Sequence, residues 1–247
     1  MITLLRPSAE RGRTKIDWLD SYHTFSFGDY QDAKHMNFGH LRVINEDWVK
    51  PGEGFGMHGH RDMEIITYVL EGKLEHRDSL GTGSVIQAGD VQVMSAGTGV
   101  RHSEFNASKS DPVHLLQIWI IPDEQGLAPR YEQKSIVDPN KKNQWQLLAS
   151  RDGKDGSITV FQDLTLSQAF IEKDQQISYQ LSPTRQAWLQ VVCGKVELDG
   201  NILSDGDGAG ILGKAEQETV TFKAQEASEI LLFDLVKTDE TIAFEGD

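Results

Sequence analysis

The sequence predicts an all-β protein built from two related β-barrels in tandem, and three observations carry this prediction. Short runs rich in β-branched and aromatic residues recur along the chain. Glycine-containing turns separate them at intervals of roughly 8–12 residues, as in β-sandwiches and barrels. Helical periodicity is weak throughout. The runs expected as strands are 41–45, 64–70, 91–94, 115–121, 157–161, 188–192, 219–222 and 230–235.

Composition and net charge limit the classes of function and partner that the protein can have. The 247 residues are 38% hydrophobic and 25% charged, which is ordinary for a globular protein with a core. The net charge of −14 argues against nucleic acid as a direct partner, and any anionic ligand would need a local positive charge. No run approaches the roughly 18 apolar residues of a membrane helix, and the first residues lack the apolar stretch of a signal peptide. We therefore expect a cytoplasmic protein, without membrane attachment and monomeric.

The single cysteine limits the chemistry further. Cys193 cannot form a disulfide within the chain, and it excludes zinc sites built on several thiolates. Because it ends the apolar run 188–193, we expect it to be a buried small hydrophobic residue.

The two halves of the chain resemble each other. Residues 68–75 (YVLEGKLE) match residues 191–197 (VVCGKVE), and both segments are followed by a Gly-Asp turn and further strands. The stretch 122–156 is rich in proline and polar residues and is expected to be a connector that can include one short helix or strand. We therefore predict an N-terminal domain over 1–135 and a C-terminal domain over 136–247.

Two pairs of residues carry the chemistry. His58 and His60 are two positions apart, and so are His102 and Glu104. Residues i and i+2 of a strand project from the same face, so each pair can reach one point in space. Facing strands that carry these pairs would supply three imidazoles and one carboxylate to a metal ion.

The second half of the sequence serves as an internal control. A lone strand histidine is usually an ordinary polar residue, and we interpret His35, His40, His76 and His114 in that way. Two such pairs, each beside a glycine turn, are harder to obtain by chance. The repeat places Gln180 and Ser182 opposite the first pair and Thr219 and Thr221 opposite the second. The second half therefore keeps the fold signals without the candidate ligands.

The sequence resembles the pirin family, two-domain members of the cupin superfamily, over nearly its full length. The segments that carry the resemblance are 18–28, 41–47, 54–60, 63–72, 76–81 and 94–106. It implies two tandem cupin (jelly-roll-like) barrels, with one metal in the N-terminal barrel held by His58, His60, His102 and Glu104. It also implies that the C-terminal barrel binds no metal. Glu64 occupies the usual cupin position of a glutamate ligand, but the resemblance places it outside the ligand set.

The resemblance further implies an activity, since bacterial pirins are regarded as quercetin dioxygenases. The substrates would be a phenolic flavonol and dioxygen, with carbon monoxide released. Glu104 would be the catalytic base, because it is the sole carboxylate among the expected ligands. Imidazole and carboxylate ligands suit Fe(II), Ni(II), Co(II), Cu(II), Mn(II) or Zn(II), and of these we favour iron(II).

Two other functions stay open on the same site. One is an isomerase or lyase acting on a small hydroxy-carbonyl compound without dioxygen; the other is a metal-dependent regulatory or binding protein. Phe55, Met57 and Arg61 flank the first histidine pair. They are expected either to line the mouth of the site or to serve packing and surface charge.

Overall fold

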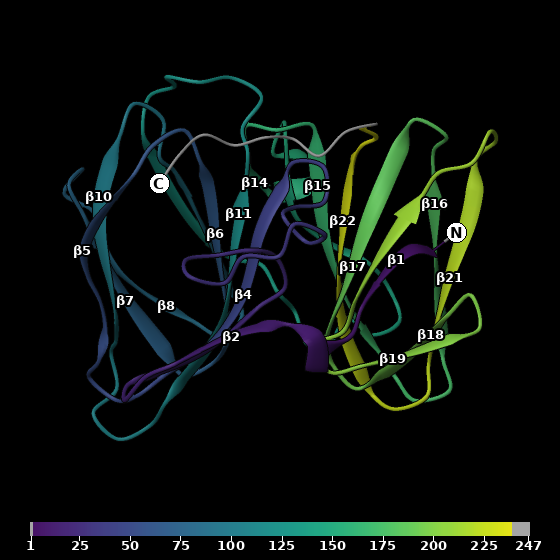
Figure 1. Ribbon diagram of the computed structural model, residues 1–247, viewed down its shortest axis with the longest axis horizontal. Helices are drawn as coiled ribbons and strands as arrows, with labels where there is room; N and C mark the ends of the chain where they lie inside the picture. Colours follow the sequence, from purple (N-terminus) through teal and green to yellow (C-terminus); the bar gives the residue numbers. More distant parts are fainter. Residues whose placement is uncertain (1, 239–247) are drawn as a thin grey trace. The chain divides into compact units, whose positions relative to one another are not determined.

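The structure is a computed structural model that describes residues 2–238, and its regular structure is almost entirely β-strand (Figure 1). The described residues divide into two compact units. The first, called here the first barrel, comprises 12–136 and 158–162; the second barrel comprises 2–11, 137–157 and 163–238. The predicted fold class is thereby confirmed. No helix formed by residues 2–238 is long and apolar enough to cross a membrane.

The first barrel consists of two antiparallel sheets that face each other (Figure 1). One has seven strands in the order β12-β9-β6-β11-β4-β3-β2, and the other has four in the order β5-β10-β7-β8. The elements of this unit are β2 (Gly12–Lys15), β3 (Leu19–His23), β4 (Leu41–Val49), β5 (Gly54–His60), β6 (Glu64–Glu71), β7 (Lys73–Asp78), β8 (Gly83–Gln87), β9 (Asp90–Ser95), β10 (Val100–Asn106), β11 (Val113–Ile120), β12 (Arg130–Ser135) and β14 (Ile158–Thr159).

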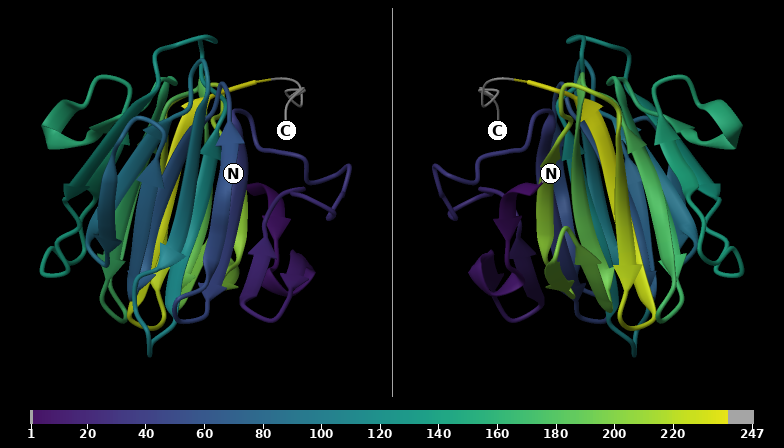
Figure 2. Two further views of the ribbon diagram at one scale, coloured as in Figure 1. Left: turned by 90° about the vertical axis from the view of Figure 1, so that its left-hand side faces the viewer. Right: turned by 90° about the vertical axis from the view of Figure 1, so that its right-hand side faces the viewer.

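The second barrel repeats this plan (Figure 2, right). One sheet contains the order β1-β20-β17-β22-β15-β13, and the other is β16-β21-β18-β19. Its elements are β1 (Ile2–Arg6), the 3-10 turn η1 (Ser8–Glu10), β13 (Gln146–Ser150), the 3-10 turn η2 (Lys154–Gly156), β15 (Leu164–Ile171), β16 (Gln176–Leu181), β17 (Arg185–Cys193), β18 (Lys195–Leu198), β19 (Asn201–Ser204), β20 (Gly208–Leu212), β21 (Glu218–Ala224) and β22 (Ser228–Val236).

The glycines that revealed the repeat have the same structural role in both units. Gly72 has φ +80° and Gly194 has φ +90°, a backbone region that other residues rarely adopt. A Cβ atom on Gly72 would lie 2.7 Å from the carbonyl oxygen of Pro112, and one on Gly194 would lie 2.5 Å from that of Ala227. Glycine is therefore needed at both turns for conformation and for close approach.

The interiors of the two barrels differ. In the second barrel, one cluster comprises 17 buried apolar residues; on β17, for example, Ala187, Leu189 and Val191 all belong to it. In the first barrel, apolar clusters lie on either side of a polar layer. On β6, Ile65 belongs to one cluster and Val69 to the other, and both are buried. Thr67, which shares their face, lies between them and contacts Glu104. Glu104 and Thr67 thus lie in the interior of the first barrel, between its apolar clusters.

Two expectations about local structure were wrong. The segment 122–156 contains β12, β13 and η2, which is more regular structure than a connector with one element. Cys193 is exposed instead of buried. The pairing of β17 with β22 shifts register between Val191 and Cys193, so the alternation that would bury the thiol is interrupted at the end of the strand.

Candidate metal centre

The register between β5 and β10 brings the two predicted residue pairs together. His58 lies directly opposite His102, and His60 lies opposite Val100. The pairing then shifts between His102 and Glu104, so that Glu104 lies opposite Phe55. The i, i+2 spacing and this antiparallel pairing together direct three imidazoles to one place.

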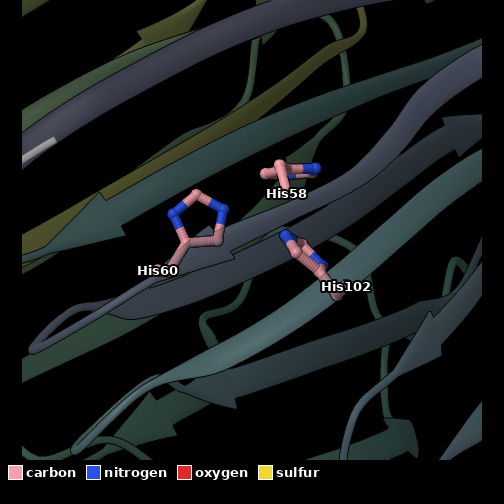
Figure 3. A group of neighbouring side chains, drawn as sticks. All are labelled: His58, His60 and His102. Carbon is pink, nitrogen blue, oxygen red and sulfur yellow. The ribbon is translucent and has the colours of Figure 1, made fainter.

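The three histidines form a compact cluster (Figure 3). Each offers one nitrogen, and these nitrogens lie within 4.8 Å of one another. The ring centroids are 4.4 Å apart for His58 and His102, 4.8 Å for His58 and His60, and 4.9 Å for His60 and His102. His60 and His102 are buried, whereas His58 is partly exposed. The cluster is therefore reachable from the His58 side.

Glu104 lies beside this cluster, in a second group of neighbouring donors. Its carboxylate lies within 4.8 Å of donor atoms of His102 and His76. Gln117 Nε2 donates a 2.9 Å hydrogen bond to Glu104 Oε2, and the Thr67 hydroxyl lies 3.4 Å from Oε1. Burial raises the pKa of the Glu104 carboxyl, against the opposing effect of these donors and of the nearby imidazoles. Gln117 thus holds one carboxylate oxygen, whereas the Thr67 hydroxyl near the other lies closer to Gln117 Oε1, at 3.1 Å.

The donor atoms of the cluster fit a divalent metal ion. His102 Nε2 is buried and has no hydrogen-bond partner within the described chain. Burial, followed by the three neighbouring imidazoles, lowers the pKa of His102 to about 2, so the ring is neutral. His58 Nδ1 donates a 2.7 Å hydrogen bond to the Gly56 carbonyl, so in the neutral ring the lone pair is on Nε2. Neutral imidazoles with free lone pairs beside a carboxylate suit first-row transition metals.

Two cavities adjoin the cluster. The larger has a volume of about 610 Å³ and the smaller about 100 Å³. Both are lined by the same aromatic and imidazole side chains, namely Phe27, Phe55, His58, His60 and Trp119. The larger volume falls within the range of about 300–1,000 Å³ usual for small-molecule sites. The open side of the histidine cluster therefore faces a space of the right size for a small aromatic molecule.

The polar wall of the smaller cavity was not found from the sequence. It includes Asp47, His23 and Asn45, which come from β3 and β4. His23 Nδ1 lies 2.8 Å from Asn45 Oδ1, and burial raises the pKa of Asp47 to about 7. None of these residues belongs to a spacing motif, so only the pairing of distant strands brings them to the site.

The residues that flank the first histidine pair behave differently from one another. Phe55 lines both cavities, and its ring packs edge-on against Trp18 at 5.1 Å. Met57 and Arg61 are exposed and line neither cavity. Glu64 is engaged elsewhere, because it accepts hydrogen bonds from the Ser95 hydroxyl and from a backbone N–H.

One histidine that was set aside belongs to this neighbourhood. His76 on β7 is fully buried, and its Nδ1 lies 3.5 Å from Nδ1 of His102. The pairing of β7 with β10 places it opposite Glu104. His76 is hydrogen-bonded to Asp78, as an ordinary polar histidine would be, but its position beside the cluster was not predicted from the sequence. The signal available in the sequence was its own i, i+2 relation to Asp78, which resembles the other pairs.

In the second barrel, the strands equivalent to β5 and β10 are β16 and β21, and they carry none of the candidate ligands. Gln180 on β16 lies directly opposite Thr219 on β21, the equivalent of His58 opposite His102. Gln180 Nε2 donates a 2.9 Å hydrogen bond to the Thr219 hydroxyl, and the Ser178 and Thr221 hydroxyls lie 3.2 Å apart. The equivalent positions thus form ordinary side-chain hydrogen bonds.

Fold and site together define a two-domain cupin with a histidine and carboxylate cluster in its first barrel. Comparison with known proteins agrees. The Pirin family model matches residues 5–120, and the model described as the quercetinase C-terminal cupin domain matches residues 147–235. The chain belongs to the pirin family.

Several relatives are similar over nearly their whole length. A protein of Escherichia coli K12 named quercetin 2,3-dioxygenase is 48% identical over 231 residues, which cover 94% of this chain and 97% of that protein. The crystal structure of E. coli YhhW aligns with a TM-score of 0.91 and 47% identity, covering 98% of this chain and 100% of YhhW. A structure of YhhW in complex with nickel(II) aligns with a TM-score of 0.90, covering 96% of this chain and 100% of YhhW.

Proposed function

We propose that this protein is a metal-dependent dioxygenase that cleaves the central ring of a flavonol such as quercetin. The observation that carries the proposal is the cluster of His58, His60 and His102 at the wall of a cavity lined with aromatic rings. The relative named quercetin 2,3-dioxygenase, at 48% identity, supports the choice of substrate.

In this proposal the metal is held by four side chains: His58, His60, His102 and Glu104. The hydrogen bond from His58 Nδ1 to the Gly56 carbonyl orients one ligand, and Gln117 orients the carboxylate. Glu104 lies outside the group formed by the three histidines, so its part in the ligand set rests on its closeness to His102 and on the resemblance to pirins.

The bound metal would supply Lewis acidity, which lowers the pKa of a coordinated hydroxyl group. Glu104 then accepts the proton of the flavonol 3-hydroxyl. The same carboxyl can return the proton to the product.

The cavity residues bind and orient the substrate. Trp119 packs edge-on against His60 at 4.8 Å and against Phe27 at 5.4 Å, so flat aromatic surfaces border the site. Arg42 also lines the larger cavity and supplies positive charge in a protein of net charge −14. A planar anion from a phenolic compound matches both properties.

The overall reaction balances with dioxygen as the oxidant. Two bonds of the central ring break, one ring carbon leaves as carbon monoxide, and both atoms of dioxygen enter the phenolic ester. A reaction with ¹⁸O-labelled dioxygen tests this directly. The proposal predicts an ester heavier by two ¹⁸O atoms and unlabelled carbon monoxide. Conversion of quercetin without label in the product would instead indicate an isomerase or lyase.

Iron(II) is the metal that we favour, and the donor set accommodates the other first-row divalent ions as well. Elemental analysis of protein purified without added metal would test this choice, and another metal at full occupancy would contradict it. A monomeric state and a cytoplasmic location stay predictions from the sequence.

A further inference from the structure

We propose that Asp78 and His76 form a hydrogen-bonded relay that sets the tautomer of His102 and so leaves its Nε2 lone pair available to the metal. Neither residue is among the proposed ligands; both act through His102 and are positioning residues. The inference rests on the proposed ligation by His102, and the experiment below separates the two.

The relay begins at a fixed carboxylate. Asp78 Oδ1 accepts 2.9 Å hydrogen bonds from the backbone N–H groups of Leu80 and Thr82. Its other oxygen, Oδ2, lies 3.0 Å from Nε2 of His76, and both side chains are fully buried. A carboxylate only accepts hydrogen bonds, so His76 must donate from Nε2.

The direction of that first bond decides the second. In the proposed relay His76 is a neutral imidazole, which donates from Nε2 and accepts at Nδ1. It lies 3.5 Å from His102 Nδ1, the long limit of a hydrogen bond. His102 therefore carries its proton on Nδ1, and Nε2 carries the lone pair. That Nε2 is the buried atom without a hydrogen-bond partner in the described chain.

The backbone holds the relay in register. β7 pairs with β10 so that Asp78 lies directly opposite His102 and His76 opposite Glu104. The ring of Tyr131 packs against His76 at 4.8 Å between centroids. The Gly56 carbonyl favours the same tautomer of His58, because it accepts a hydrogen bond from Nδ1. Two ligands of the cluster thus have their Nδ1 protons directed at fixed acceptors, an arrangement that raises metal affinity.

Two substitutions should break the relay. In Asp78→Asn, the Leu80 and Thr82 N–H groups hold the amide oxygen, so the NH₂ group faces His76 and reverses both hydrogen bonds. His76→Leu removes the acceptor. We expect each change to weaken Ni(II) binding by about 10–100-fold, measured by competition with a chromophoric chelator. His76→Gln can donate and accept in the same order, and it should retain an affinity within about threefold of wild type.

A readout without metal tests the tautomer itself. Long-range ¹H–¹⁵N NMR of the metal-free protein distinguishes Nδ1–H from Nε2–H imidazole, and the His102 signal is identified by its loss in His102→Gln. The relay predicts the Nδ1–H form in wild type and the Nε2–H form in Asp78→Asn. An Nε2–H form in wild type would overturn the inference.

A matched control is His114→Leu, because His114 also pairs with a carboxylate, 2.9 Å from Glu46 Oε1, but lies outside the cluster. It should leave the affinity unchanged. An equal loss of Ni(II) affinity in His76→Leu and His76→Gln would indicate that His76 is a direct ligand, and it would overturn the relay. If His76→Leu does not fold, Asp78→Asn and His76→Gln decide in the same way. His102→Gln with wild-type affinity would instead refute the ligand assignment.

Discussion

His58 and His102 lie directly opposite each other on β5 and β10, with their ring centroids 4.4 Å apart. In the second barrel the equivalent strands place Gln180 opposite Thr219, where the two side chains form a hydrogen bond. One strand pair of the same fold therefore carries candidate metal ligands in one unit and an ordinary polar contact in the other. At these two positions the strands pair in the same way, so the difference there lies in the side chains; beyond them the pairing shifts between His102 and Glu104 only in the first barrel.

Replacing His102 by Ala should remove the metal and the activity. His102 contributes a donor nitrogen to the cluster itself. Its loss should therefore lower metal affinity by more than the roughly 10–100-fold expected for a residue that only supports a ligand. Elemental analysis and Ni(II) titration measure the effect. Thr219→Ala at the equivalent position of the second barrel is the control and should bind normally. Full metal occupancy in His102→Ala would contradict the assignment.

Glu104→Gln separates proton transfer from metal binding. The amide keeps an oxygen near the cluster and the contact with Gln117, so part of the metal affinity should remain. Loss of the base should lower kcat by about 10²–10⁴-fold. Steady-state rates at full metal occupancy measure this effect. Glu64→Gln is the control, because it replaces a buried carboxyl that lies outside the cluster. A wild-type rate would show that Glu104 is not the base.

Trp119→Leu should affect substrate binding and leave the metal in place. The Trp119 ring lines both cavities and packs against His60. Trp119 is not one of the residues that could offer a ligand atom to the metal. Loss of its aromatic contacts should raise KM for quercetin about 3–10-fold. Trp145→Leu in the second barrel is the control. A drop in metal occupancy with unchanged KM would assign Trp119 a role in supporting the cluster instead.

Asp47→Asn should change how stability depends on pH. Burial raises the pKa of Asp47 from 3.8 to about 7, so the folded protein binds a proton that the unfolded chain has lost. The free energy of unfolding of the metal-free wild type should thus fall between about pH 4 and pH 7, by up to ~4 kcal/mol from this group. Below that pH window the contribution of Asp47 to the free energy of unfolding is fully present. Asn cannot ionise, so the variant should lack this slope.

Urea unfolding at pH 4, 5.5, 7 and 8 measures the difference between Asp47→Asn and wild type. The variant should gain stability relative to wild type as the pH rises through this window. A constant difference across the four values would mean that Asp47 ionises as freely in the folded protein as in the unfolded chain.

Much of the fold and of the cluster could be predicted because their signals are local. Alternating residues and glycine turns identify strands, and the i, i+2 spacing of His58 with His60 needs only strand geometry to place both rings together. The repeat adds a comparison within the chain. Because Gln180 and Thr219 stand at the equivalent positions of the second half, the repeat distinguishes site residues from packing residues.

The remaining features depend on contacts between distant segments. β1 pairs with β20, so Ile2 lies opposite Ile211, which no local pattern indicates. Asp47 reaches the small cavity, and His76 reaches His102, because of the strand order and the register of β4 and β7. Register is set by packing across the whole sheet, so short motifs do not reveal it.

Carbon monoxide release from quercetin and dioxygen tests the central claim most directly. Protein stripped of metal would be reconstituted separately with Fe(II), Ni(II), Co(II), Cu(II) and Mn(II), with His102→Ala as the control. We predict carbon monoxide in amounts that follow metal occupancy, with none from His102→Ala. Fully occupied protein that releases no carbon monoxide with any of these metals would contradict the account.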